Sequence, residues 1–252
     1  AASDVYKRQA LNDLSEVVLP DSVTSLGGAA FSNNIHLTKV QLSANLKVIP
    51  ATAFGITLAN TLNVGLVQLT IPEGVESIGS GAFGGHEIQT LALPVSLKQI
   101  DSRAFKSNQI QNLYIPDNVT ELGSSAFEQT SGKNCLASVR LPEGLLKINS
   151  KTFANAALTR VDIPYSLTTL NKNAFYGNKD GFVQVYTPND EHISFEVSGA
   201  TFQIHIRTDV WTIKDFAYDG AKITGLSETG IKKREENRNL VLPDKTPTGD
   251  YI

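Results

Sequence analysis

The 252-residue sequence contains a single cysteine and no methionine, and both scarcities limit what the chain can be. Because Cys135 has no second cysteine to pair with, no disulfide can form within the chain. This leaves the cellular compartment open, since exported proteins of many bacteria also lack disulfides. The absence of an initiating methionine predicts that the sequence is a fragment or a processed form.

Long apolar runs and an excess of one charge are also missing. No stretch approaches the ~18 apolar residues of a transmembrane helix, so we expect no transmembrane segment in this fragment. Lysine and arginine total 22 against 25 aspartate and glutamate residues, which gives a net charge of −3. This balance argues against nucleic acid and anionic membranes as partners. The 41% of hydrophobic residues is sufficient for a packed core.

Two residue types recur with one period. Proline occurs at positions 72, 94 and 116 and phenylalanine at positions 83, 105 and 127, in each case 22 residues apart. Because two independent residue types keep the same period, we interpret residues 14–181 as seven repeat units of roughly 22 residues. Extra residues lengthen two units, around residues 55–65 and 128–135, and Ser43 replaces the proline of the second unit.

The physical logic of one unit can be read from its apolar positions. Leu91 and Leu93 alternate with polar residues, which is the period of a strand, and Pro94 then ends the strand because it cannot donate to a ladder. Leu97 and Ile100 follow at a spacing of three, which fits either a tight turn or a short strand. An Ala-Phe pair closes the unit and places a ring in the core. Since one unit cannot bury both of its apolar edges, stacking of successive units supplies the core.

The repeated pattern L-x-x-L-x-(I/L)-P-x-x-(V/L)-x-x-(I/L)-x-x-x-A-F resembles the BspA-like leucine-rich repeat of bacterial and some protozoan surface proteins. The resemblance covers roughly two-thirds of the chain. It implies a leucine-rich-repeat solenoid, a curved right-handed coil of short strands and turns with about seven repeats. It also implies a cell-surface or secreted protein, often an adhesin that binds host extracellular proteins or other bacteria.

The sequence departs from the family at one place. The family commonly carries a cysteine a few residues after the phenylalanine, where this chain has Asn34, His86, Asn108, Thr130, Ala156 and Asn178. Asparagine can serve the same turn, because its side chain bonds to nearby backbone and tolerates left-handed geometry. We therefore expect the fold to be kept without any cysteine chemistry.

The ends of the chain do not follow the repeat. Residues 1–13 form a leader that is either non-native or disordered. Residues 182–208 alternate like strands and predict irregular terminal coils that close the stack. In residues 209–252, Asp219 and Gly220 predict a β-hairpin, and residues 240–243 restart the repeat motif, so we expect a further, truncated repeat there.

No catalytic constellation stands out, and we expect no enzymatic activity, no cofactor and no metal. The four histidines share no metal-ligand spacing, and we interpret His36 and His86 as turn residues. Cys135 lies in an insertion. Because no histidine is near it in sequence, the support for a nucleophilic role is weak.

The strand residues that point away from the core are the better candidates for function. The third positions of the strand segments are Lys39, Gln68, Thr90, Asn112, Ser138 and Arg160, and the fifth positions are Gln41, Thr70, Ala92, Tyr114, Arg140 and Asp162. Solenoids bind macromolecules through such extended surfaces, and tyrosine and arginine are enriched at binding hot spots. The alternative is that these are ordinary solvated strand residues without a binding role.

Three functions are compatible with the sequence. The leading hypothesis is a non-enzymatic surface or secreted protein that binds a protein or glycan ligand, for example in the host extracellular matrix. The second is a targeting region of a larger surface enzyme such as a cell-wall hydrolase. The third is a structural stalk.

Overall fold

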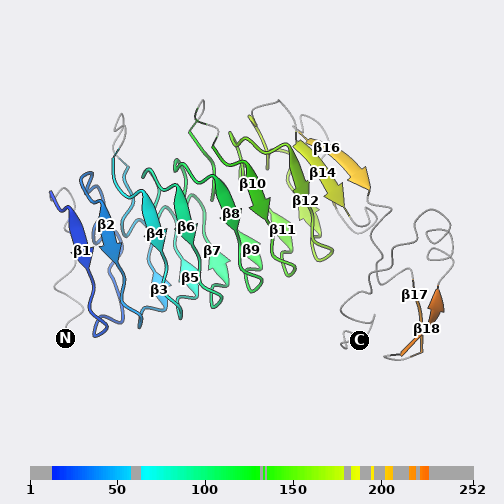
Figure 1. Ribbon diagram of the computed structural model, residues 1–252, viewed down its shortest axis with the longest axis horizontal. Coiled ribbons are helices and arrows are strands. Elements are labelled where there is room, and N and C mark those ends of the chain that lie inside the picture. Colours follow the sequence, from blue (N-terminus) through cyan, green and yellow to red (C-terminus); the bar gives the residue numbers. More distant parts are fainter. Residues whose placement is uncertain are drawn as a thin grey trace.

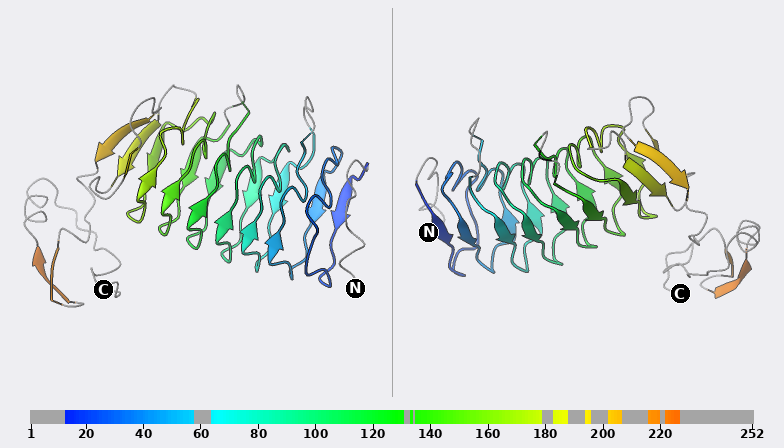
Figure 2. Two further views of the ribbon diagram at one scale, coloured as in Figure 1. Left: turned by 180° about the vertical axis from the view of Figure 1, so that it is seen from behind. Right: turned by 45° about the horizontal axis from the view of Figure 1, so that its top comes forward.

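The computed structural model describes residues 13–57, 64–130, 133, 135–178, 183–187, 194–195, 202–206, 216–219 and 222–226. Over these residues the chain forms an elongated parallel β-solenoid, which confirms the predicted fold (Figure 1). From the second to the seventh coil, each coil contributes one strand to each of two rows, and successive coils follow one another along the long axis in every view (Figure 2). The described part contains no helix, and hence none that could span a membrane. The predicted leader, apart from Asp13, lies outside the described residues.

The first strand row consists of three-residue strands, each of which ends two residues before the proline position of its coil. Its members are β1 (Glu16–Val18), β2 (Lys39–Gln41), β4 (Gln68–Thr70), β6 (Thr90–Ala92), β8 (Asn112–Tyr114), β10 (Ser138–Arg140) and β12 (Arg160–Asp162). The middle residue of each strand is buried or half-buried and its two neighbours are exposed. Within this row β1 pairs with β2, β4 with β6 and β8 with β10, each in parallel and in register, so that Tyr114, for example, lies opposite Arg140. β2 and β4, β6 and β8, and β10 and β12 are neighbours in contact across the row.

The second strand row resolves the ambiguity over the second apolar pair in favour of short strands. Seven two-residue strands form one parallel sheet: β3 (Val48–Ile49), β5 (Ser77–Ile78), β7 (Gln99–Ile100), β9 (Glu121–Leu122), β11 (Lys147–Ile148), β13 (Thr169–Leu170) and β15 (Ser194–Phe195). From β3 to β13, the second residue of each strand is buried in the core between the two rows. The spacing of three in the sequence therefore joins a turn residue such as Leu97 to a strand residue such as Ile100.

A column of phenylalanine rings runs through the core along the solenoid. Consecutive rings are stacked with centroids 5.2–5.9 Å apart and planes inclined by 2–13°. The column contains Phe31, Phe54, Phe83, Phe105, Phe127, Phe153 and Phe175. The ring column extends across both lengthened units, which shows that the extra residues leave the stacking intact.

The backbone around each phenylalanine forms a third ladder between coils. Phe105 N–H donates to Ala126 O of the next coil at 2.9 Å, and Arg103 N–H and Ser107 N–H make equivalent bonds at 3.0 and 2.7 Å. Arg103 and Ser107 have φ of 60° and 61°, in the left-handed region that non-glycine residues adopt only at a cost. The bonds to the next coil offset this strain and leave the backbone of the turn hydrogen-bonded.

Buried amides follow the phenylalanines and link the coils. The Asn108 amide donates to Phe83 O at 2.8 Å and to Phe105 O at 3.0 Å, while its oxygen accepts a hydrogen bond from Ile88 N–H at 3.0 Å. Asn178 makes the same set of bonds three coils later. Where the place holds Thr130, the buried side chain of Gln129 supplies the amide and accepts hydrogen bonds from two N–H groups. These side chains satisfy backbone groups that would otherwise be buried without partners.

Beyond the repeats, the first strand row continues with two more parallel strands. In the first row, β14 (Val183–Thr187) pairs with β12 and β16 (Phe202–Ile206) pairs with β14. Further along, β17 (Phe216–Asp219) and β18 (Lys222–Leu226) form an antiparallel pair, where Asp219 and Gly220 predict a hairpin. The predicted restart of the repeat at residues 240–243 lies outside the described residues.

Candidate binding face

The strand face, defined here as the third and fifth positions of the first strand row from β2 to β12, is exposed throughout. All nine side chains proposed as a binding surface are exposed: Lys39, Gln68, Thr90, Asn112, Tyr114, Ser138, Arg140, Arg160 and Asp162. Parallel pairing aligns third positions with third positions, as in Gln68 opposite Thr90 and Asn112 opposite Ser138. The structure thus brings residues that are 22 to 26 positions apart in sequence into lateral contact.

Every basic side chain of the strand face has a carboxylate partner. Lys39 Nζ pairs with Glu16 of the preceding coil, and Arg160 Nη2 pairs with Asp162 of its own strand at 2.8 Å. Arg140 pairs with Asp117, which follows the proline of the preceding coil. The strand face therefore has little net electrostatic attraction for a polyanion.

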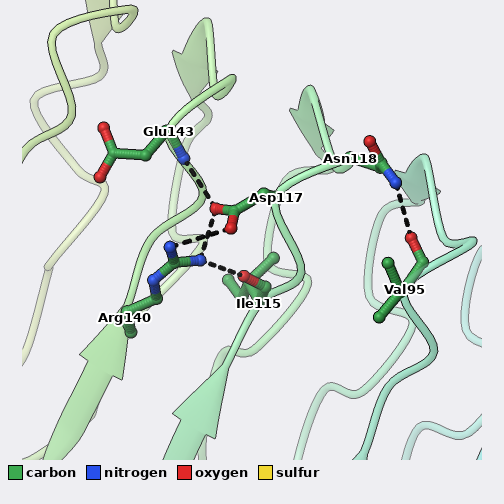
Figure 3. A network of polar contacts seen from close by, with 6 residues as sticks. All are labelled: Val95, Ile115, Asp117, Asn118, Arg140 and Glu143. Atoms are coloured by element: carbon green, nitrogen blue, oxygen red, sulfur yellow. Dashed lines mark hydrogen bonds and ion pairs between the residues drawn. The ribbon is translucent and has the colours of Figure 1, made fainter. Parts of the chain in front are cut away.

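Arg140 is the centre of a polar network at the edge of the strand face (Figure 3). Its Nη1 donates to Asp117 Oδ1 at 2.5 Å and to Ile115 O at 3.3 Å, and its Nη2 donates to Asp117 Oδ2 at 3.0 Å. Asp117 Oδ1 also accepts a hydrogen bond from Glu143 N–H at 3.2 Å. The hydrogen bonds from Arg140 hold the pKa of the Asp117 carboxyl below its ordinary value, and the same pairing raises the pKa of the Arg140 guanidinium. The pair stays ionised across the physiological range.

The network fixes a cation over an aromatic ring. The Arg140 guanidinium carbon lies 4.9 Å from the centroid of the Tyr114 ring, while 58% of the Tyr114 surface is exposed. Contacts of this kind contribute about 0.5–1 kcal/mol at exposed sites. Since Asp117 holds the guanidinium in a bidentate fork, Tyr114 and Arg140 form a rigid pair on the surface.

A shallow hollow of about 380 Å³ lies beside this pair. Within it, Ser138 Oγ donates to Asn112 Oδ1 at 2.7 Å. The hollow is lined by Leu91, Asn112, Leu113, Tyr114, Ser138, Val139 and Arg140. It is the part of the strand face where an aromatic ring, an amide and a hydroxyl meet.

The sequence did not point to the carboxylates that complete the strand face. Glu16, Asp117 and Glu143 lie outside the proposed positions, although Asp117 follows Pro116 in the same unit as Tyr114. Its partner Arg140 belongs to the next unit, which is 26 residues long, so the pairing depends on how the inserted residues are accommodated. Only the register of β8 and β10 reveals it.

The other titratable groups give no sign of a reactive site. His36 pairs with Asp13 at 3.5 Å on the surface. His86 is buried, accepts a hydrogen bond from Leu66 N–H at Nδ1 and donates from Nε2 to Phe54 O at 2.8 Å. Burial lowers its pKa to about 4, so the ring is neutral. Within the described ranges, no three histidine, cysteine or acidic residues form a metal-binding group. His192 and the side chain of His205 lie outside those ranges.

A second hollow lies on the side of the phenylalanine turns. It has a volume of about 510 Å³ and is lined mainly by glycines and hydroxyl residues, together with Arg103 and Lys106. Gly84 and Gly85, which lie in the turn after Phe83, form part of its wall. Lys106 pairs with Glu128 at 3.1 Å beside it. Among the residues that line this hollow, none is aromatic.

Comparison with known proteins supports the repeat architecture. A family model described as "BspA type Leucine rich repeat region" matches residues 8–65 and 62–180, in six copies. No curated protein matches the chain. A leucine-rich repeat protein from Bacteroides ovatus ATCC 8483 has a similar structure, with 21% identity and a TM-score of 0.50. The match covers 74% of this chain and 52% of that one, so this chain spans about half the length of the Bacteroides protein.

Two further solved structures align over much of the chain. One is a leucine rich cell surface protein from Faecalibacterium prausnitzii A2-165, with 20% identity and a TM-score of 0.33, covering 69% of this chain and 73% of that one. The other is the pneumococcal vaccine antigen PcpA, with 18% identity and a TM-score of 0.42, covering 89% of this chain and 66% of that one.

Proposed function

This chain belongs to the family of BspA-type leucine-rich repeats, and from that premise we propose that it is a non-enzymatic binding protein whose strand face holds macromolecular partners. The observation that carries the proposal is the unbroken, exposed column of third and fifth positions from β2 to β12. Repeat proteins use such extended surfaces for large ligands, since each coil adds one equivalent contact. We further propose that residues 14–181 form the binding array and that residues 182–208 close its stack.

The Tyr114–Arg140 pair is the proposed anchor of the interaction. Hot spots are enriched in tyrosine and arginine, and side chains that are already fixed lose little entropy on binding. Asp117 fixes Arg140, and Arg140 in turn lies over the Tyr114 ring. The remaining positions would contribute complementarity of shape and hydrogen bonding.

The proposed location is the cell surface or the extracellular medium. Support comes from the family, whose repeats occur in surface proteins of bacteria and some protozoa. Adhesion to host extracellular-matrix proteins, or to proteins or glycans of neighbouring cells, is the corresponding role. An antibody against this chain should label intact native cells or their medium, and labelling only after lysis would reject the location.

The binding role can be tested with the chain itself. The immobilised protein is titrated with extracellular-matrix proteins and with glycans, and then compared with a variant that combines Tyr114→Ala, Arg140→Ala and Arg160→Ala. We expect the triple variant to lose most of the binding, because it removes the large side chains of the strand face. Its thermal midpoint should stay close to that of the parent, since all three side chains are exposed.

A matched control changes the opposite side of the solenoid. Val48, Gln99 and Lys147 are exposed on the second strand row, and their combined replacement by alanine alters as many side chains without touching the strand face. This control should bind like the parent. If the strand-face variant also binds like the parent, the strand face is not the binding site.

A further inference from the structure

The electrostatics of the strand face restrict the chemistry of its ligand. Proteins that bind polyanions leave lysine and arginine side chains available for phosphate or sulfate groups. Here Lys39, Arg140 and Arg160 each have a carboxylate partner within the strand face or at its edge. A ligand that needs a free cation, such as a sulfated or uronic-acid chain, would have to break these pairs. The charges therefore favour an uncharged partner.

The other side chains of the strand face offer an amide or a hydroxyl at every coil from β2 to β10. Its uncharged polar members are Gln41, Gln68, Thr70, Thr90, Asn112 and Ser138. Because Ser138 Oγ donates to Asn112 Oδ1, the Asn112 amide nitrogen keeps its two donors and Ser138 Oγ keeps its acceptor capacity. These groups repeat with the coil spacing of about 4.8 Å, which is comparable to the length of one pyranose residue. Such a row matches the many hydroxyls of a sugar chain.

Tyr114 carries Arg140 over one face of its ring, and more than half of its surface is exposed. Arg140 of the next coil covers one face at 4.9 Å. The fifth position of the preceding strand, β6, holds the exposed Ala92, and a methyl group offers too little surface to cover an aromatic ring. β6 and β8 lie side by side in the row (Figure 1). A pyranose ring carries C–H groups on its flat faces, and these pack favourably on the electron-rich face of an aromatic ring.

We infer that the strand face binds an uncharged glycan, with one sugar ring stacked on the open face of Tyr114 and its hydroxyls bonded by Asn112 and Ser138. The inference rests on the proposed function and names the ligand class of the same site. Arg140 acts as a positioning residue, because Asp117 holds it against the covered face of Tyr114.

The experiment is native affinity electrophoresis of the protein in gels that contain one polysaccharide each. The neutral probes are β-glucan, mannan, xylan and galactan, and the anionic comparators are polygalacturonate and chondroitin sulfate. We expect at least one neutral probe to retard the protein, with a Kd that changes little between low and high salt, because no ion pair forms on binding. Neither anionic comparator should retard it more strongly.

Three variants test whether the retardation depends on the ring of Tyr114. Tyr114→Ala should raise the Kd at least about tenfold, as expected for a hot spot. Ala92→Leu should raise it similarly, since the larger side chain covers the open ring face while every hydrogen-bonding group remains. The control is Tyr176→Ala, which removes another exposed tyrosine with a cation over its ring, Lys151 at 5.8 Å, from the side of the phenylalanine turns. It should leave the Kd unchanged.

The outcomes separate the ligand class from the proposed function. If immobilised matrix proteins bind through Tyr114 while no neutral polysaccharide retards the chain, the glycan inference is overturned and the binding role stands. Retardation by the anionic probes alone, or retardation that Tyr114→Ala and Ala92→Leu leave unchanged, also overturns the inference. If no protein and no polysaccharide binds, both proposals fail.

Discussion

Single side chains that bridge two coils carry much of the specificity of this fold. Asn108 bonds to backbone groups at Ile88, Phe83 and Phe105, and so links two coils with one buried amide. Loss of such a side chain leaves buried backbone groups unsatisfied, each at a cost of about 1–3 kcal/mol. The sequence placed Asn34, Asn108 and Asn178 correctly in turns. The reach of Asn108 and Asn178 to the preceding coil could not be predicted, because it depends on the register of the stack.

His86 makes the stability of the protein dependent on pH. Its pKa is about 4 in the folded chain and near 6.5 in the unfolded chain, so between these values the unfolded state binds more protons. The stabilisation by neutral His86 is therefore complete above pH 6.5 and is lost as the pH falls toward 4. The difference corresponds to about 3 kcal/mol. Urea denaturation at pH 7.5, 6, 5 and 4 should show this loss.

The variant His86→Gln isolates the histidine from the carboxylates that titrate at lower pH. Beside Thr130, which holds the equivalent position in another coil, the uncharged amide of Gln129 makes comparable hydrogen bonds to the backbone. His86→Gln should therefore flatten the pH dependence between 4 and 6.5. A parent and a variant with the same slope in this interval would show that His86 does not control it.

The elements of the solenoid are turns and strands of two or three residues, none of which is stable alone. Their stability comes from equivalent neighbours in adjacent coils. The sequence predicted the first strand row from its alternation and the ring column from its period. It left the second strand row ambiguous, because two-residue strands have no alternation to read. The third ladder was not predicted, since Arg103, Ser125 and Lys151 carry no signal for the positive φ that they adopt.

The ring column should be sensitive to the loss of one member. Phe105 lies between Phe83 and Phe127, with centroids 5.8 and 5.5 Å away, and is 1% exposed. Phe105→Ala would open a cavity between two rings, and we expect it to destabilise the protein by about 3–5 kcal/mol in urea denaturation. The exposed Tyr176→Ala should change stability by less than about 0.5 kcal/mol. Equal midpoints for the two variants would count against a stacked core ring.

Close contact between coils makes some glycines irreplaceable. A Cβ at Gly123 would lie 2.2 Å from Ser102 N and 2.4 Å from Asp101 C, both backbone atoms of the preceding coil. Gly123→Ala must push the coils apart, and we expect a loss of at least about 2 kcal/mol. At Gly28 the nearest atom to an added Cβ is Ala51 O at 3.6 Å, so Gly28→Ala should be neutral or slightly stabilising. Equal thermal midpoints for Gly123→Ala and Gly28→Ala would contradict this packing.

At the scale of the whole molecule, the described coils combine an in-line stack with a polar strand face whose basic side chains are paired with carboxylates. The sequence was sufficient to predict the class of fold and which strand positions face outward, because both follow from periodicity. It was insufficient for the Tyr114–Arg140–Asp117 network, since that network joins two coils across a lengthened unit. Periodicity places residues on faces, whereas contacts between coils require the register.

The central claim is that equivalent positions of successive coils lie directly beside one another. It is tested most directly by a distance between nitroxide labels at positions 41 and 162, introduced as Gln41→Cys and Asp162→Cys in a Cys135→Ser background. Both belong to the fifth-position column, five coils apart, so double electron–electron resonance should give one narrow distribution centred at roughly 24 Å. A broad distribution, or a centre beyond about 40 Å, would contradict an in-register stack at this spacing.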